Sequence, residues 1–174
     1  MLDTLITSKT RIRMLLKFFT NSASSAYLRG LAEEFGESTN SIRHELNNLS
    51  KAGYLISTED GRTIQYRANT QHPLYPEIKS LVHKYLGVDK IIDAIVSKLG
   101  DLRAAYIVGD YAKGHDSGTI ELLLIGELDK QYLEKLVSRA QSLINRTIKV
   151  SHLAEAEFES EKIPNALLVW GAKD

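Results

Sequence analysis

Hydrophobic residues in the first third of the chain recur three and four positions apart, which is the spacing of amphipathic helices. Polar residues and one glycine supply the helix ends: Ser24 or Ser25 is the expected cap of the second helix, Gly36 ends it, and Ser38 or Thr39 caps the third. Two helices joined by a short turn that contains glycine indicate a helix-turn-helix. The three stripes are Ile12, Leu15, Leu16 and Phe19; Leu28, Leu31, Ala32 and Phe35; and Ile42, Leu46, Leu49 and Gly53.

A β-hairpin is predicted directly after the third helix. Residues 54–58 and 63–67 are rich in β-formers, and Asp60-Gly61 between them is a strong hairpin turn signal. Arg62 lies next to the turn and Arg67 on the returning strand. Three helices followed by such a hairpin predict a winged helix, whose third helix enters the major groove of DNA while the hairpin flanks the phosphates.

The outward face of the third helix carries the candidate DNA contacts. It bears no carboxylate, because Glu45 is displaced toward the flank, whereas an ordinary solvated helix mixes both signs. Asn and Arg also match the edges of adenine and guanine in the major groove. The alternative is a merely polar surface helix. Together with the hairpin residue, the predicted contacts are Asn40, Arg43, His44, Asn47, Lys51 and Arg62.

Two further helical stripes follow Pro73 and Pro76 and are separated by Gly87. They offer more apolar surface than one small domain needs. Two explanations of this apolar surface remain open: packing between two domains, and a dimer seam. The two are compatible. The stripes are Ile78, Leu81, Val82 and Tyr85, then Ile91, Ile92, Ile95 and Val96.

The last third of the chain alternates strand and helix patterns. A strand over residues 103–108 ends at Gly109, a polar loop over 110–114 follows, and a second strand covers 120–125. A long amphipathic helix runs from Leu133 to Ile144, and residues 147–152 and 166–170 predict further strands. The expected fold class is α+β, with a mixed sheet covered by helices.

Composition narrows the classes of protein that remain. The chain has 174 residues, 43% hydrophobic and 25% charged, and contains no cysteine. This excludes a disulfide scaffold, a cysteine nucleophile and thiolate metal sites, and it favours a cytoplasmic location. We expect no signal peptide and no membrane span. The 22 basic and 22 acidic residues balance, so DNA binding must rest on where the charges lie rather than on net charge.

Residues 9–69 resemble the bacterial ArsR-like winged-helix transcriptional regulators. The resemblance is carried by Leu28–Gly36, Ser41–Leu49 and Gly53–Ile56. It implies sequence-specific binding of duplex DNA as a dimer, with the outward positions of the third helix in the groove. The Cys and His clusters of the metal-sensing members have no match here, so we expect no metal sensor.

Residues 88–174 resemble the minimal nucleotidyltransferases of the polymerase-β type. The stretch Val108–Gly114, continued by Asp116–Leu124, carries the likeness. In that family a Gly-Ser turn holds the nucleotide triphosphate, and two aspartates two residues apart on the next strand bind Mg²⁺, where the period of a strand places them on one face.

The predicted nucleotidyltransferase site departs from that pattern. Beside Gly109, Asp110 occupies the serine position, and Thr119 and Glu121 stand where the two metal aspartates are expected. Residues 147–151 supply no third carboxylate. We therefore expect a degenerate site with no catalytic residue, no metal and no cofactor: a pseudo-nucleotidyltransferase rather than an enzyme. A rearranged metal site that includes Asp116 is a weaker alternative.

The sequence thus predicts a winged helix-turn-helix domain over 1–72, connecting helices with a possible dimer seam over 73–100, and a nucleotidyltransferase-like α+β domain over 101–174. The predicted function is a cytoplasmic transcriptional regulator that binds double-stranded DNA as a homodimer. The C-terminal domain would serve dimerisation or the sensing of an unknown small-molecule effector. The alternatives are an active Mg²⁺-dependent nucleotidyltransferase targeted by the winged helix, and a winged helix that binds protein.

Overall fold

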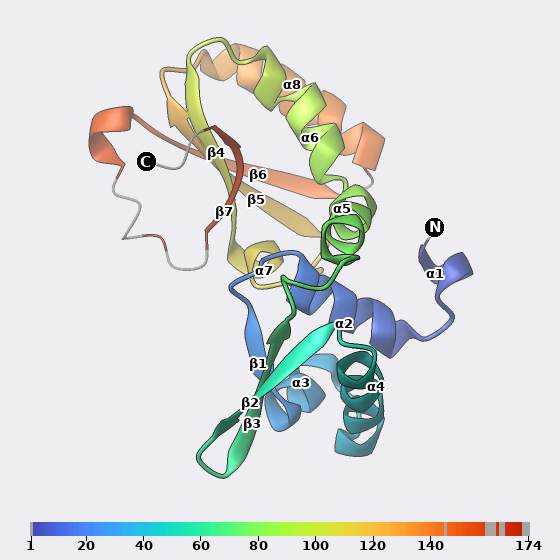
Figure 1. The fold of residues 1–174 in the computed structure, drawn as a ribbon. Coiled ribbons are helices and arrows are strands. Elements are labelled where there is room, and N and C mark those ends of the chain that lie inside the picture. The colour runs from blue at the N-terminus through green and yellow to red at the C-terminus, as the bar shows by residue number, and fades with distance from the viewer. Residues whose placement is uncertain (1, 145, 159–162, 164–165, 172–174) are drawn as a thin grey trace. The chain divides into compact units, whose positions relative to one another are not determined.

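A computed structural model gives the fold of residues 2–144, 146–158, 163 and 166–171 (Figure 1). The chain divides into two compact units, unit 1 over residues 1–82 and unit 2 over residues 83–174. The units are described separately below. The domain boundaries expected at residues 72 and 100 stay a prediction.

Unit 1 begins with a short helix and three longer ones. Ser8 caps α2 by accepting a hydrogen bond from the Arg11 amide, and Ser38 caps α4 in the same way through the Ser41 amide. Gly36 ends α3 with a left-handed φ of 64°, as expected of a glycine at this position. The helices are α1 (Leu2–Leu5), α2 (Lys9–Phe19), α3 (Leu28–Phe35) and α4 (Thr39–Lys51).

The predicted hairpin is present and belongs to a three-stranded sheet. Strands β2 (Leu55–Asp60) and β3 (Thr63–Ala68) pair antiparallel around Gly61, whose φ of 60° suits the tight turn. A strand that the sequence did not indicate, β1 (Ser25–Tyr27), pairs with β3, so the sheet order is β1-β3-β2. The N-cap of α3 is therefore Tyr27, and the prediction of Ser24 or Ser25 was wrong because those residues lie before or within a strand.

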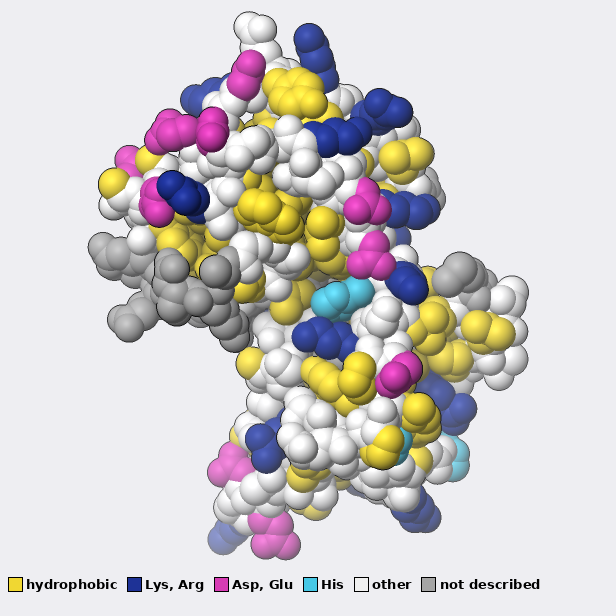
Figure 2. Space-filling view, turned by 45° about the horizontal axis from the view of Figure 1, so that its top comes forward, with side chains coloured by type: hydrophobic (Ala, Val, Ile, Leu, Met, Phe, Trp, Pro, Cys, Tyr) yellow, Lys and Arg dark blue, Asp and Glu magenta, His cyan; other side chains and the backbone are white. Residues whose placement is uncertain are grey.

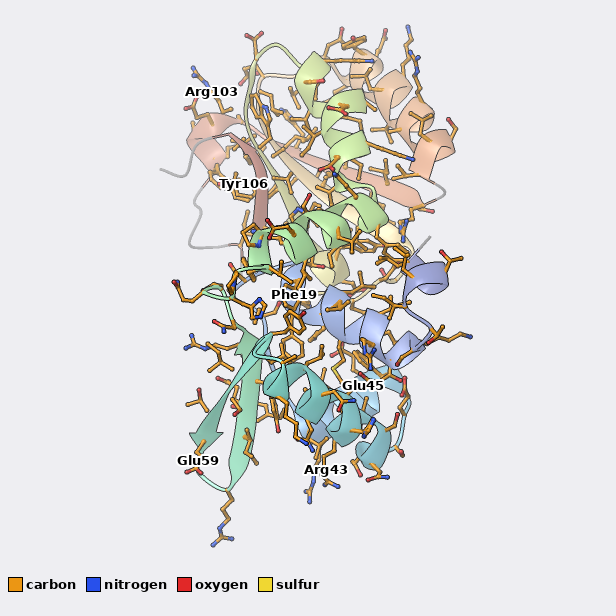
Figure 3. The ribbon with its side chains drawn as sticks, turned by 45° about the vertical axis from the view of Figure 1, so that its right-hand side comes forward. Phe19, Arg43, Glu45, Glu59, Arg103 and Tyr106 are labelled. Carbon is orange, nitrogen blue, oxygen red and sulfur yellow. The ribbon has the colours of Figure 1, made fainter. Side chains whose placement is uncertain are left out.

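The core of unit 1 contains most of the predicted helical stripes. Met14 and Phe18, which the stripes left out, are buried as well, whereas Leu28, Phe35 and Gly53 are only half-buried. Fully buried side chains come from α2, α3 and α4, and the start of the hairpin adds Leu55 and Ala68. The aromatic ring of Phe19 lies inside this unit and packs against Tyr75, with ring centroids 5.5 Å apart (Figure 3). Burying such aliphatic and aromatic side chains stabilises the fold by roughly 1.5–3 kcal/mol each. Within α2, α3 and α4, the least exposed are Met14, Phe18, Phe19, Leu31, Ile42 and Leu46.

Unit 2 contains a mixed four-stranded sheet of order β6-β5-β4-β7. β5 pairs antiparallel with β4 and parallel with β6, and β4 also pairs antiparallel with β7. The parallel pair is connected through helix α8, as a parallel connection requires. The α+β fold class with a mixed sheet is therefore confirmed. The strands are β4 (Leu102–Val108), β5 (Thr119–Gly126), β6 (Thr147–Leu153) and β7 (Leu167–Gly171).

Helices α6 (Val88–Ala94) and α8 (Lys130–Ile144) lie side by side in this unit (Figure 1). Ile91 and Ile95 are completely buried, so these two members of the predicted dimer seam serve the interior of the chain. α5 (Tyr75–Leu86) runs across the division between the units, and a 3₁₀ turn, η1 (Val96–Lys98), follows α6. The segment predicted as a loop after β4 forms a short helix, α7 (Gly109–Ala112).

The opposite faces of the sheet carry different side chains. On β4 and β5, Ala105, Ile107, Leu122 and Leu124 are buried on one face. The other face holds Ala104, Leu123 and Ile125, against which Tyr106, Phe158 and Leu168 pack, as the period of two along each strand dictates. Tyr106 and Phe158 have ring centroids 5.3 Å apart.

Candidate functional site

The outward face of α4 has the exposure that the helical period predicts. Asn40, Arg43, His44, Asn47 and Lys51 are all exposed, whereas Ile42, Leu46 and Leu49 are buried. Figure 3 shows Arg43 projecting away from the other helices. These side chains are therefore accessible to a large partner.

Glu45 is the one carboxylate of α4. The sequence places it toward the flank of the outward face, and in the structure it is buried, with an exposed fraction of 7%. Arg11 Nε donates to Glu45 Oε2 at 2.9 Å and Arg11 Nη2 to Oε1 at 3.3 Å, while the Ser8 hydroxyl donates to Oε1 at 3.1 Å. The side chain points toward α2 (Figure 3). Its charge is thus matched inside unit 1 and does not repel an anion at the outer face of α4.

A groove of about 780 Å³ lies between α4, the start of α3 and the hairpin. Three arginines from three elements line it, and none of the lining residues within the described part of unit 1 is acidic. Converging arginines create a positive potential that attracts phosphates. Sequence reasoning found two of the three, and missed Arg29 because its helix was assigned a purely structural role. The lining includes Arg29, Arg43, Asn47, Arg62, Ile64 and Tyr66.

The hairpin is tied across its sheet by side chains. The Tyr27 hydroxyl donates to Asp60 Oδ2 at 2.5 Å, and Gln65 Nε2 donates to the same hydroxyl at 3.1 Å. The hydrogen bond to Asp60 raises the pKa of Tyr27 above its ordinary value. The Asp60 carboxylate is therefore held on the sheet by the Tyr27 hydroxyl.

In unit 2, the predicted nucleotidyltransferase positions gather at the end of β4. Gly109 has φ of 68°, and a Cβ added there would lie 2.7 Å from Glu121 Oε1, so only a glycine leaves room for the Glu121 carboxylate. Val108 is the strand partner of Glu121. Asp110 follows in α7 and lies with its Oδ2 3.9 Å from His115 Nδ1, both side chains being about half exposed.

The neighbouring strand adds a cation to this end of the sheet. Thr119 pairs with Thr147 and Glu121 with Lys149 in the parallel register of β5 and β6. Lys149 therefore stands beside Glu121, at the strand on which the family pattern has a third carboxylate. In the part of the chain that the structure describes, no group of three or more His, Cys, Asp or Glu side chains is placed to hold a metal ion.

Asp116 belongs to a structural cluster. Arg146 Nη2 donates to Asp116 Oδ2 at 2.9 Å, and the Tyr111 hydroxyl donates to Asp116 Oδ1. Arg146 Nε also donates to the Tyr111 hydroxyl at 2.7 Å, and the guanidinium lies over the ring of Tyr85. Burial alone would raise the pKa of Asp116, but these hydrogen bonds and the Arg146 charge lower it overall. The alternative in which Asp116 ligates a metal loses its candidate, because the carboxylate is already occupied.

Comparisons with known proteins find a small set of similar solved structures. No family model matches the chain, and no curated protein matches it. One similar structure is a mutant of the toxin-antitoxin MntA-HpeT, with 19% identity, a TM-score of 0.41, and coverage of 49% of this chain and 73% of that one. Another is the tri-AMPylated HEPN toxin of Shewanella oneidensis in complex with MNT antitoxin, with 16% identity, a TM-score of 0.38 and coverage of 50% and 71%. A toxin-antitoxin with AMP-PNP has 18% identity, a TM-score of 0.39 and coverage of 49% and 73%.

At these identities the likeness concerns the fold alone, and no residue role is carried over from it. The comparison corrects one prediction: the expectation that the chain is not an enzyme was wrong, because the matched structures include an AMPylated toxin with its antitoxin and a complex with AMP-PNP. That expectation relied on the residue types at Asp110, Thr119 and Glu121 and on the absence of a carboxylate over residues 147–151. The strand register that places Lys149 beside Glu121 was not part of it. No helix in the described ranges is long and apolar enough to cross a membrane.

Proposed function

We propose that unit 1 binds duplex DNA, with α4 in the major groove and the β2–β3 hairpin against the neighbouring phosphates. The observation that carries this proposal is the groove in which Arg29, Arg43 and Arg62 converge without an acidic neighbour in its lining. A helix fits the major groove of B-DNA, and the helix-and-hairpin order of unit 1 supports the winged-helix interpretation.

The residues of this surface fall into two groups, one that contacts bases and one that contacts the DNA backbone. Arg43 and Asn47 lie one helical turn apart on the exposed face of α4, where a guanidinium and an amide recognise guanine and adenine edges. Arg62 beside the hairpin turn and Lys51 in the last turn of α4 contact phosphates, and Asn40 and His44 complete the footprint. The sequestered Glu45 leaves this footprint free of negative charge on α4.

Sequence-specific binding of this kind fits a transcriptional regulator that binds as a homodimer to a palindromic site. The dimer rests on less apolar surface than the sequence indicated, because Ile91 and Ile95 are buried inside unit 2. A small-molecule effector of unknown identity stays part of this proposal.

Binding selection from a random duplex library tests the DNA proposal. An enriched sequence with two half-sites supports both DNA reading and the dimer, and an enriched single half-site supports DNA reading by a monomer. The matched control is Arg43→Ala carried through the same selection, which should lose the enrichment at one or more base positions. A wild-type chain that enriches no sequence would overturn the proposal.

A second candidate function belongs to unit 2: binding of a nucleoside triphosphate and transfer of its nucleotidyl group. It is favoured by the Glu121 carboxylate packed against Gly109 at the start of α7, with Lys149 beside it on β6. One or two carboxylates together with substrate phosphates suffice to hold Mg²⁺, so Glu121 and Asp110 would be its protein ligands, and the ion would neutralise charge on the phosphates. Lys149 would contact a phosphate directly.

In such a transfer, an acceptor hydroxyl oxygen forms a bond to the α-phosphorus and releases its proton to solvent, the bond between the α-phosphorus and the bridging oxygen breaks, and pyrophosphate leaves. Titration calorimetry with ATP tests the binding step. We expect Mg²⁺-dependent binding that Glu121→Gln and Lys149→Ala both weaken, while Lys98→Ala on the exposed surface of the same unit has no effect. Equal affinity in wild type and Glu121→Gln would contradict this second candidate.

A further inference from the structure

Tyr27, Gln65 and Asp60 form a hydrogen-bonded network across the three-stranded sheet of unit 1. β3 is the central strand, with Tyr27 and Thr58 both opposite Gln65 on its two neighbours. Directly paired residues share one face of a sheet, and Asp60 lies two positions after Thr58, so it shares that face as well. Tyr27 therefore reaches over β3 to Asp60, and its hydrogen bond spans all three strands.

The opposite face of the same hairpin contributes to the groove. Leu55 pairs with Ala68 and both are buried, which fixes this face toward the helices of unit 1. Tyr66 and Ile64 follow on β3 at steps of two, and both line the groove together with Arg62. Ile64 is an exposed large hydrophobic residue. Tyr27 and Thr63, from the face of the network, line the groove as well, so the network borders the groove and holds its hairpin wall.

The hairpin needs such support because little else holds its outer half. Residues 57–64 are exposed along both strands, whereas burial is confined to the Leu55 and Ala68 end. Two strands without apolar cover have little stability of their own. A hydrogen bond to a carboxylate is stronger than a neutral one, and Gln65 adds a second bond to the same hydroxyl.

We propose that Tyr27 and Asp60 form a positioning latch that holds the hairpin so that Arg62 and Arg43 face one DNA duplex. This inference rests on the DNA binding proposed for unit 1. Tyr27 and Asp60 act through Arg62 and are positioning residues. The latch also holds the Asp60 carboxylate, which is not among the residues that line the groove.

The test is a double-mutant cycle on the duplex enriched by the selection described above, measured by fluorescence anisotropy over a range of salt concentrations. We expect Tyr27→Phe to weaken binding about 5-fold in the wild-type background, as loss of one hydrogen bond to a charged group allows, and to have no effect in the Arg62→Ala background. Tyr54→Phe, which alters a tyrosine stacked on His72 in the same unit, is the matched control and should bind normally. Thermal melting verifies that each variant is folded.

Variants of Asp60 separate a latch from simple charge repulsion. Asp60→Asn keeps an oxygen that accepts from Tyr27 and should bind DNA at least as tightly as wild type, whereas Asp60→Ala should weaken binding as Tyr27→Phe does. Equal tightening by both Asp60 variants, or a Tyr27→Phe effect that is the same with and without Arg62, overturns the latch while leaving DNA binding intact. A wild-type chain that enriches no duplex overturns the DNA proposal and the latch together.

Discussion

Arg43 of unit 1 and Arg146 of unit 2 have opposite surroundings. In unit 1, Arg43 is exposed on α4 and lines an open groove, while the one carboxylate of that helix is buried against Arg11. In unit 2, Arg146 is only 16% exposed, and its guanidinium is held by Asp116, Tyr111 and the ring of Tyr85. On the face drawn in Figure 2, basic and acidic side chains are interspersed. The comparison teaches that local pairing, rather than net charge, decides which cations are available to a partner.

The largest effect on this comparison is expected from Arg146→Ala. It leaves the partly buried Asp116 carboxylate without its cation and should lower the free energy of unfolding by about 3 kcal/mol. DNA affinity should be unchanged. Urea unfolding measures the first quantity, and the exposed Arg139 of α8, replaced by Ala, is the matched control. An equal loss for both variants would show that the cluster does not stabilise unit 2.

Arg43→Ala should show the reverse pattern. Removal of a bidentate interaction with a base should weaken binding of the selected duplex by about 1–3 kcal/mol and relax the sequence preference. The free energy of unfolding should change by no more than about 0.5 kcal/mol, since the side chain is exposed. Anisotropy titration and urea unfolding of the same preparation provide both numbers. A decrease in stability with unchanged binding would refute the assignment of Arg43 to DNA.

Acid should destabilise unit 2 through Asp116. The pKa of Asp116 is lowered in the folded state, so this carboxylate contributes stability above its unfolded pKa and loses it as the pH falls through the folded value. We therefore expect the wild type to lose unfolding free energy below about pH 5. Asp116→Asn should start less stable at neutral pH and lose less on acidification. Parallel pH profiles of the two proteins would contradict this role of Asp116.

The smallest effect is expected at Lys51, in the last turn of α4. Lys51→Ala removes one ionic interaction with a phosphate, so it should weaken binding of all duplexes alike and reduce the slope of log affinity against log salt by about one. Anisotropy titrations at several salt concentrations measure that slope. Lys98→Ala in unit 2 serves as the control and should leave the slope unchanged. A sequence-dependent effect of Lys51→Ala would show that this residue contacts bases rather than the DNA backbone.

The helical period predicted much of unit 1. Burial of Ile42 and Leu46 and exposure of Arg43 and Asn47 follow directly from 3.6 residues per turn, and the Asp60-Gly61 turn follows from local chemistry. Partners far away in the chain could not be read in this way. Glu45 binds Arg11, which lies 34 positions away in the sequence, and β1 forms a strand through its pairing with β3.

In unit 2 the strands and α8 were predictable, whereas the site was not. The period of two places Thr119 and Glu121 on one face, but the neighbour of Glu121 depends on the register of β5 against β6, which brings Lys149 beside it. Likewise, Asp116 looked available for a metal because its partner Arg146 lies 30 positions away. The residue types at the site were visible in the sequence, and their pairing was not.

The pairing of β4 with β7 sets the order in which the chain acquires structure during synthesis. All strands of unit 1 are present once Ala68 has left the ribosome, whereas β4 has one open edge until β7, which ends at Gly171, arrives to cover it. N-terminal domains fold first as the chain emerges, and open strand edges pair readily with foreign strands. Unit 2 therefore passes through a stage in which Ala105 and Ile107 lie on an uncovered strand, and in the cell this stage is the one at which chaperones or aggregation compete with folding.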